Sequence, residues 1–193
     1  MAATPSTMLG LGTRMPDFTL PDTTGKTVSS NAITGAPGTL VMFICNHCPF
    51  VIHVREELVR MVTEYQAKGI KAVAVSANDV ATHPDDGPEK MAAIARDNGF
   101  TFPYLYDETQ EVAKAFRAAC TPDFFLFDGE GALYYRGQMD DSRPGNDKPV
   151  TGSDLRVAMD SLIAGSPPPA QQKPSMGCNI KWRSGNAPTY FGV

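Results

Sequence analysis

Two cysteines with C-x-x-C spacing, Cys45 and Cys48, close the apolar run in TLVMFICNHCPFVIHV (residues 39–54). Pro49 follows directly and suits the first position of a helix, where its missing N–H costs no hydrogen bond. Cys48 would then cap that helix and face the unpaired backbone N–H groups at its positive end. Such a setting favours the thiolate, which is the reactive form of cysteine. The spacing therefore predicts a nucleophilic Cys48.

The CNHC segment has other interpretations. Both thiols could simply be buried as small apolar groups, and His47 is best interpreted as a solvated imidazole, although it could add positive charge. A metal-binding site would use Cys45 and Cys48 with His47 or His53, and thiolate with imidazole suits Cu(I) or Zn(II). The sequence has no second C-x-x-C and no H-x-x-x-H pair. A closed metal site would need distant residues, so we assign no metal ligand and no cofactor.

Periodicity predicts the elements that must position these cysteines. Residues 39–44 form a continuous apolar run, typical of a strand covered on both faces, and residues 70–79 predict a second buried strand. Between them, apolar residues at steps of three and four predict a helix over 49–67, closed by Gly69. Further elements alternate along the chain: a hairpin in 16–30, a helix in 91–99, a strand in 102–107, a helix in 108–118, a hairpin over 123–138, and a helix over 153–165 with Ser153 as its N-cap. This order predicts an α/β fold with a central mixed sheet and helices on both faces.

Length and composition limit the number of domains and the kinds of binding partner that we expect. The chain has 193 residues, 42 % hydrophobic and 20 % charged, with a formal net charge of −4. We expect one domain over residues 1–165, with a flexible arm over 1–12. The proline-rich segment 166–193 carries Ile180, Trp182, Tyr190 and Phe191 and is expected to pack on that domain as a tail. The acidic balance disfavours nucleic acid, and no apolar run reaches the length of a membrane span. The N-terminus lacks the pattern of a signal peptide, so a cytoplasmic location is expected.

Several motifs resemble one family. The run G-x-x-x-P-D-F-T-L-x-D-x-x-G-K-x-V (12–28), the segment CTPDFFLFD (120–128), and the segments YRGQMDDSRPGND and SMGCNIKW resemble the peroxiredoxin-like, or redoxin (AhpC/TSA-type), group of the thioredoxin-like superfamily. This resemblance implies a thioredoxin-like fold with an N-terminal hairpin extension and a docked C-terminal tail. It also implies a cis proline at Pro122, facing the active thiol. Thr121, and Cys120 with it, would then lie beside the CNHC segment.

The resemblance allows two alignments of the CNHC segment with the active-site motif of thioredoxins. In the favoured one, Cys48 takes the place of the first active cysteine of thioredoxins; in the other, Cys45 and Cys48 are together the C-x-x-C pair. Neither register contains the P-x-x-x-T/S-x-x-C motif of typical peroxiredoxins, and W-C-G-P-C is missing too. Either product of thiolate attack needs a resolving thiol. The candidates, in order and with little separation, are Cys45, Cys120 and Cys178.

The leading hypothesis is a thiol–disulfide oxidoreductase acting on a protein or small-molecule disulfide. It would draw on a thiol donor such as thioredoxin or glutathione, without nucleic acid or membrane and with a homodimer as one possible assembly. The alternatives are a thiol peroxidase reducing hydroperoxides, the copper or zinc protein described above, and a non-catalytic scaffold. Other polar residues are interpreted as structural. Arg117 and Arg136 are expected at the surface, Asp140, Asp141 and Arg143 in a loop ion pair, Asn78 and Asp79 in a turn, and His83 facing water.

Overall fold

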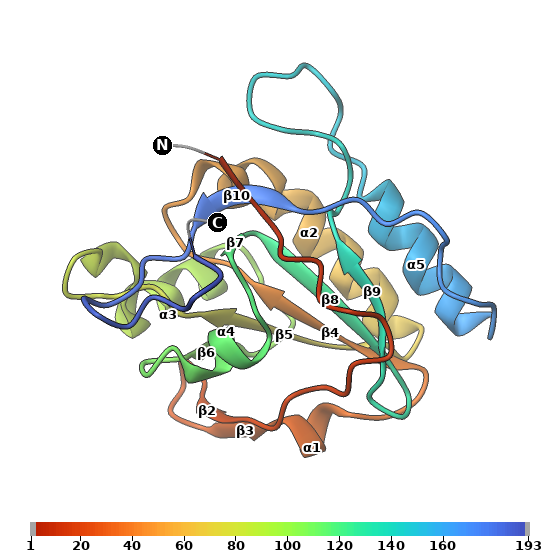
Figure 1. The fold of residues 1–193 in the computed structure, drawn as a ribbon, viewed down its shortest axis with the longest axis horizontal. Helices are drawn as coiled ribbons and strands as arrows, with labels where there is room; N and C mark the ends of the chain where they lie inside the picture. The colour runs from red at the N-terminus through yellow and green to blue at the C-terminus, as the bar shows by residue number, and fades with distance from the viewer. Residues whose placement is uncertain (1–2, 192–193) are drawn as a thin grey trace.

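The computed structural model describes residues 3–191, in which a five-stranded sheet has the order β6-β5-β4-β8-β9. Strands β4, β5 and β6 run parallel, and the hairpin β8–β9 joins β4 in the antiparallel sense (Figure 1). The strands of this sheet are β4 (Gly38–Phe43), β5 (Lys71–Ser76), β6 (Tyr104–Tyr106), β8 (Asp123–Asp128) and β9 (Leu133–Gly137). The central mixed sheet with helices on both faces that the sequence predicted is confirmed.

The helices and the short strands surround this sheet. The helices are α1 (Ser30–Ile33), α2 (Pro49–Ala67), α3 (Pro88–Asp97), α4 (Glu111–Ala115) and α5 (Ser153–Ile163), with a 3₁₀ turn η1 (Pro84–Asp86) before α3. The short strands are β1 (Ala3–Pro5), β2 (Thr19–Pro21), β3 (Thr27–Ser29), β7 (Cys120–Thr121) and β10 (Met176–Asn179). Ser153 is not the N-cap of α5, because Gly152 holds that place with a φ of 68° that favours glycine.

Both faces of the sheet are covered, and the residues of β4 alternate between them. Leu40 and Met42 belong to the apolar cluster formed with α2, α3 and α5. Val41 and Phe43 belong to the opposite cluster, which Phe116 and the N-terminal hairpin complete. Because both sides of β4 meet apolar partners, its sequence is continuously apolar and not alternating. This buried strand fixes the place where the chain emerges toward Cys45 and Cys48.

A second, smaller sheet lies across the N-terminal end of α2 and has the order β1-β10-β7 (Figure 1). Its strands are antiparallel, with Cys178 opposite both Ala3 and Thr121. The prediction of a flexible arm over residues 1–12 is therefore wrong for residues 3–5, because backbone pairing with β10 holds them. Residues 1–2 lie outside the described part of the chain.

The segment after β10 packs along the opposite face of the main sheet. Ile180 is buried and Trp182 partly buried in the apolar cluster on that face. The backbone of Lys181 bridges to β5, since its N–H donates to Asn78 (2.8 Å) and its carbonyl accepts from the N–H of Asp79 (2.8 Å). No helix in residues 3–191 is both long enough and apolar enough to cross a membrane.

The contact between β10 and β7 requires glycine at position 177. A Cβ placed on Gly177 would lie 2.0 Å from the carbonyl oxygen of Thr121, which is backbone and cannot move aside. We expect Gly177→Ala to lower the free energy of unfolding by about 1–3 kcal/mol, the usual cost of overpacking. Urea denaturation measures this change.

Gly10→Ala is the matched control, because its nearest neighbour would lie at an ordinary 3.8 Å. Equal stability of the two variants would show that β10 does not approach β7 this closely in solution.

Candidate active site

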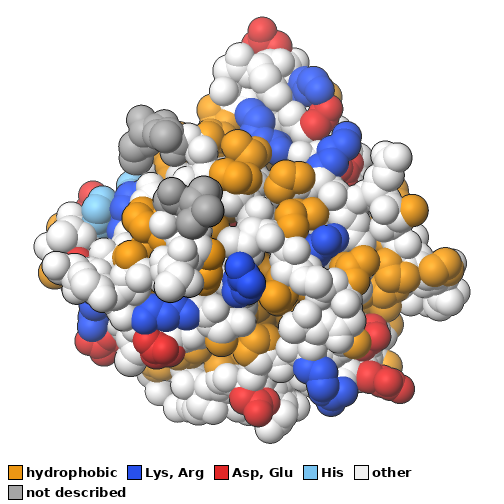
Figure 2. Space-filling model, viewed as in Figure 1, with side chains coloured by type: hydrophobic (Ala, Val, Ile, Leu, Met, Phe, Trp, Pro, Cys, Tyr) orange, Lys and Arg blue, Asp and Glu red, His pale blue; other side chains and the backbone are white. Residues whose placement is uncertain are grey.

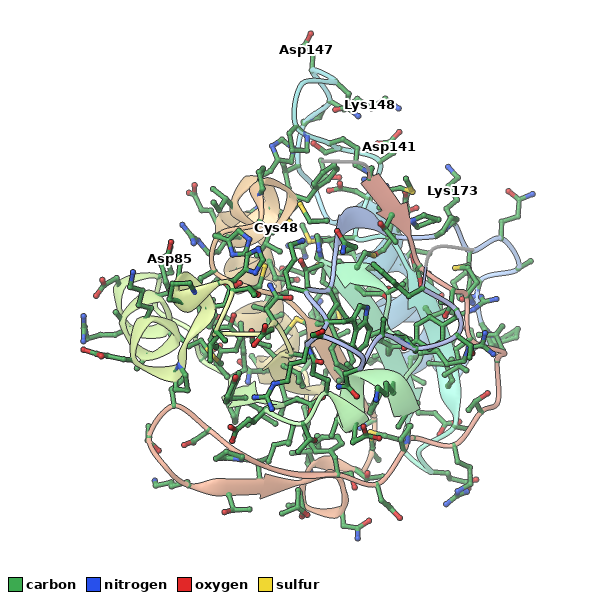
Figure 3. All side chains as sticks on the ribbon, turned by 60° about the vertical axis from the view of Figure 1, so that its left-hand side comes forward. Cys48, Asp85, Asp141, Asp147, Lys148 and Lys173 are labelled. Carbon is green, nitrogen blue, oxygen red and sulfur yellow. The ribbon has the colours of Figure 1, made fainter. Side chains whose placement is uncertain are left out.

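Cys48 is the N-cap residue of α2 and has no exposed surface (Figure 3). Its backbone is extended, with φ −66° and ψ 123°, and Pro49 begins the helix as the sequence predicted. The Cys48 Sγ lies 3.1 Å from the carbonyl oxygen of Thr121 on β7. Strand β7 therefore covers the end of the helix from which this sulfur projects.

Cys45 also contacts Thr121, through a different group of that residue. Its Sγ lies 3.3 Å from the hydroxyl of Thr121, and only 3 % of the residue is exposed. Thr121 thus touches both sulfurs, with its carbonyl toward Cys48 and its hydroxyl toward Cys45. The Thr121–Pro122 bond is cis, as the family resemblance implied.

Neighbouring thiols decide the charge of Cys48. A hydrogen bond from Cys45 is the main cause that lowers the pKa of Cys48, to about 4, with further hydrogen bonds from Cys178 and from the backbone N–H of Val51, while burial opposes them. The same contact raises the pKa of Cys45 well above its usual value. Burial and Cys48 together raise the pKa of Cys178 to about 12. The Thr121 carbonyl favours the protonated Cys48 thiol, since it can only accept, but it is one acceptor against several donors.

The two remaining cysteines differ in their access to Cys48. Cys178 reaches it from β10, which pairs with Thr121. Cys120 turns away, because its thiol donates to the carbonyl of Pro122 at 3.5 Å. Burial raises the pKa of Cys120 well above its usual value, so this thiol stays protonated. The structure brings Cys45, Cys48 and Cys178 together and leaves Cys120 beside them as a buried thiol.

His47 is not the solvated loop imidazole that we expected. Its Nδ1 lies 2.6 Å from the Oδ2 of Asp86, and its ring stacks on that of His83 with centroids 5.3 Å apart. His83 is accordingly half-buried and does not simply face water. No local sequence pattern predicts this arrangement, because it depends on how the 83–87 loop folds over the CNHC segment.

Asp86 is the functional candidate that the sequence analysis missed. It is fully buried, and its carboxylate accepts hydrogen bonds from the N–H of Asn46 (2.8 Å) and from the side-chain amide of Asn78 (2.7 Å). Asn78 thus has more than a turn role, since it holds Asp86 from the carboxyl end of β5. One sulfur of Cys45, one ring nitrogen of His47 and one carboxylate oxygen of Asp86 all lie within 4.8 Å of one another. These three residue types include the usual ligands of zinc.

Other expected side chains lie elsewhere. His53 contacts the hydroxyl of Ser142 (2.7 Å), so it does not join His47. Arg136 binds Gln172, and Arg117 lies over the ring of Tyr190. Within residues 3–191, no arginine hydrogen-bonds to a cysteine sulfur.

The expected ion pair of the 140–150 loop has different partners. Asp141 pairs with Lys148, and both side chains lie on the projecting loop (Figure 3). Charged side chains of both signs gather on this projection (Figure 2). Asp140 is buried and accepts backbone N–H groups, including that of Gly152 at 2.6 Å. Arg143 donates to backbone carbonyls and to Gln138. The loop is therefore folded by Asp140 and not by an Asp–Arg pair.

A cavity of about 20 Å³ lies beside the cis proline, between Phe50, Pro122 and Arg143. It has room for about one water molecule. No cysteine lines it, so it gives no open path to the Cys48 sulfur. Access to that sulfur requires a movement of the chain.

Comparison with known proteins decides the family. The AhpC/TSA family matches residues 11–136, which is more than half of the chain. The chain belongs to the AhpC/TSA family. This redoxin resembles an uncharacterized conserved protein from Geobacillus kaustophilus, with 52 % identity over 95 % of this chain and 97 % of the other and a TM-score of 0.93. It also resembles a hypothetical protein from Sinorhizobium meliloti 1021, with 47 % identity over 94 % and 100 % and a TM-score of 0.93.

A more distant likeness concerns the fold alone. The thioredoxin domain of a thiol-disulfide oxidoreductase from Bacteroides vulgatus is 20 % identical over 77 % of this redoxin and 98 % of that chain, with a TM-score of 0.58. No match was found among curated proteins. Family and fold together support an oxidoreductase.

The charge on Cys48 can be titrated. With a pKa of about 4, the reduced protein should hold one thiolate per chain between about pH 5 and pH 8, where a free cysteine of pKa about 8.5 stays largely protonated. Ultraviolet thiolate absorbance of the folded protein measures it. We expect Cys48→Ser to abolish this thiolate and Cys120→Ser to keep it. A thiolate that first appears above pH 8 would contradict the assignment.

A second titration concerns Asp123, a buried carboxyl that the sequence analysis also missed. Burial raises its pKa to about 7, and hydrogen bonding from Ser6 and from backbone N–H groups offsets only part of this effect. Its folded-state pKa lies above the unfolded value of 3.8, so the stabilisation from this group is complete below about pH 3.8 and is lost as the pH rises through about 7.

We therefore expect Asp123→Asn to remove a fall in the free energy of unfolding between pH 4 and pH 7. Urea denaturation at several pH values measures that fall. If the asparagine variant keeps the wild-type slope, Asp123 is not the group responsible.

Proposed function

We propose that this redoxin catalyses thiol–disulfide exchange with Cys48 as the nucleophile and Cys45 as the resolving thiol. The observation that carries the proposal is the convergence of Cys45 and Cys178 on a single sulfur at the beginning of α2. Thiol donors and helix amides surround the Cys48 sulfur, and such surroundings stabilise the thiolate.

The exchange is a balanced two-step displacement. The Cys48 thiolate attacks a substrate disulfide, which forms a mixed disulfide at Cys48 and releases one substrate thiolate. Cys45 then loses its proton and attacks the Cys48 sulfur, which forms the Cys45–Cys48 disulfide and releases the second substrate thiolate. His47 is placed to accept that proton, because a nitrogen of its ring lies within 4.8 Å of the Cys45 sulfur.

The choice of Cys45 over Cys178 follows from access. Cys48 has no exposed surface, and β10 with Cys178 lies across it. A substrate disulfide reaches Cys48 only after β10 moves away, and Cys178 moves with it. Cys45 directly follows β4 of the main sheet and does not move with β10, and its Sγ contacts the Thr121 hydroxyl. In the closed form, Cys178 shields the Cys48 sulfur.

The cycle needs an external reductant. The Cys45–Cys48 disulfide returns to two thiols when a dithiol protein of the thioredoxin type, or two equivalents of a small thiol such as glutathione, takes up the oxidation. The substrate class is a protein or small-molecule disulfide, because the exchange requires only a disulfide that reaches the Cys48 sulfur.

Peroxide reduction is the second candidate function, because the motifs that resemble the peroxiredoxin-like group lie partly within the AhpC/TSA match over residues 11–136. It would start from the same thiolate, which takes one oxygen from the hydroperoxide and becomes a sulfenic acid. The geometry of the site favours peroxide reduction less than disulfide exchange. Cys48 is buried, and no described arginine donates to its sulfur.

Single cysteine variants test the proposal. We expect Cys48→Ser to reduce disulfide reduction to the uncatalysed background in an insulin-reduction assay, because it removes the attacking sulfur. Cys45→Ser should accumulate a mixed disulfide with the substrate, visible by intact-protein mass spectrometry, because resolution is blocked. Cys120→Ser is the matched control and should keep the wild-type rate.

Two outcomes would contradict this scheme. If Cys178→Ser traps the mixed disulfide and Cys45→Ser does not, the tail cysteine resolves. If the wild type consumes hydrogen peroxide rapidly but leaves insulin oxidised, the second candidate function replaces the first.

A further inference from the structure

Three side chains of different chemistry point their donor atoms toward one another beside the cysteine pair. Cys45 and His47 come from the segment after β4, and Asp86 comes from the end of η1. Their sulfur, nitrogen and oxygen atoms lie within 4.8 Å of one another. Ligand bonds of about 2.0–2.3 Å in a tetrahedral zinc site separate the ligand atoms by roughly 3.3–3.8 Å. Small shifts of side chains would therefore close such a site.

The carboxylate is already oriented for ligation. Oδ1 of Asp86 accepts the backbone N–H of Asn46, and Oδ2 accepts the amide of Asn78 at 2.7 Å. Asp86 has no exposed surface. Outer hydrogen bonds of this kind fix the direction of a ligating group and are typical of metal sites. One side of Oδ2 is left toward His47.

The contact between His47 and Asp86 is short but is not a hydrogen bond. Nδ1 is buried and lies 2.6 Å from Oδ2, and it makes no hydrogen bond of standard geometry in the described structure. A nitrogen and a carboxylate oxygen this close need a positive charge near both, which a ring proton or a bound cation can supply. A cation bound to both atoms supplies that charge, and stacking on His83 holds the imidazole ring in place.

We propose that Cys45, His47 and Asp86 form a three-ligand site for a divalent cation of the Zn²⁺ class, with one coordination position open. A mixed sulfur, nitrogen and oxygen set suits zinc. It does not suit calcium or magnesium, which take oxygen ligands. On binding, the Cys45 thiol releases its proton to solvent as the metal–sulfur bond forms, and nothing is oxidised or reduced.

The cation and the disulfide exclude each other. A Cys45 sulfur bound to Zn²⁺ is unavailable to Cys48, and a Cys45–Cys48 disulfide removes the sulfur ligand. The site is therefore open only in the reduced protein. This consequence rests on the proposed exchange, whereas the ligand set itself rests on geometry and is tested without any activity.

Metal titration tests the site directly. Metal-free protein, reduced with a phosphine that does not bind zinc, is titrated with Zn²⁺ against a chromophoric chelator. We expect one ion per chain. Cys45→Ser and His47→Gln should each weaken binding by about 100-fold or more, because even outer partners of a metal site contribute about 10–100-fold. With Co²⁺ as the probe, the thiolate-to-metal absorption band should vanish in Cys45→Ser.

Matched variants give the controls. His53→Gln and Cys120→Ser change the same residue types outside the cluster and should leave the Zn²⁺ affinity unchanged. Asp86→Asn keeps the shape of a buried side chain and should weaken binding in a protein whose circular dichroism is unchanged. If Asp86→Asn does not fold, His47→Gln still tests the metal site, because His47 is only partly buried and its substitution should leave the fold intact.

Three results would overturn the site: no Zn²⁺ bound in competition with the chelator, affinity that survives both Cys45→Ser and His47→Gln, or affinity that His53→Gln lowers equally. Loss of binding in Cys48→Ser with full binding in Asp86→Asn would assign the ion to the two cysteines and also overturn the proposed ligand set.

Discussion

The structure depends on keeping one sulfur charged in a place that water does not reach. An ion taken from water into a protein interior must be compensated by donors, or it takes up a proton instead. Cys48 meets this condition through the first turn of α2 and through two neighbouring thiols. Each thiol can donate only while protonated, so the charge on Cys48 fixes the protonation of Cys45 and Cys178. The three thiols therefore behave as one unit with a single negative charge.

This unit depends on β1 and β10 of this redoxin, which lie over the site. Strand β10 carries one of the donating thiols, and β1 pairs with its outer edge. Backbone pairing keeps the Cys178 thiol close, and the absence of a side chain at Gly177 allows β10 to approach the carbonyl of Thr121. Removing the cover exposes Cys48 and also removes one donor. Opening therefore makes the sulfur both more accessible and more basic, and thus more nucleophilic per thiolate.

The sequence predicted what local rules control. The helix over 49–67 follows from an apolar stripe and from Pro49, and the buried strands follow from continuous apolar runs. These local rules could not predict which distant segments of the chain contact each other. Asp86 is 40 residues from Asn46 in sequence and reaches it only because η1 turns the chain back. Asp123 is a similar case, because nothing in the sequence around this aspartate indicates that its side chain is fully buried.

Asp86 links the two chemistries of the site. Its buried carboxylate carries negative charge close to a sulfur that must itself become negative, either to attack Cys48 or to bind a cation. That charge raises the pKa of Cys45, in addition to the larger effect of Cys48. A cation at His47 and Asp86 reverses the sign of the local field and favours the Cys45 thiolate. The same loop can therefore hold Cys45 as a protonated donor to Cys48 or, with a cation bound, as a metal thiolate. Which state prevails would depend on whether a metal ion occupies the position between His47 and Asp86.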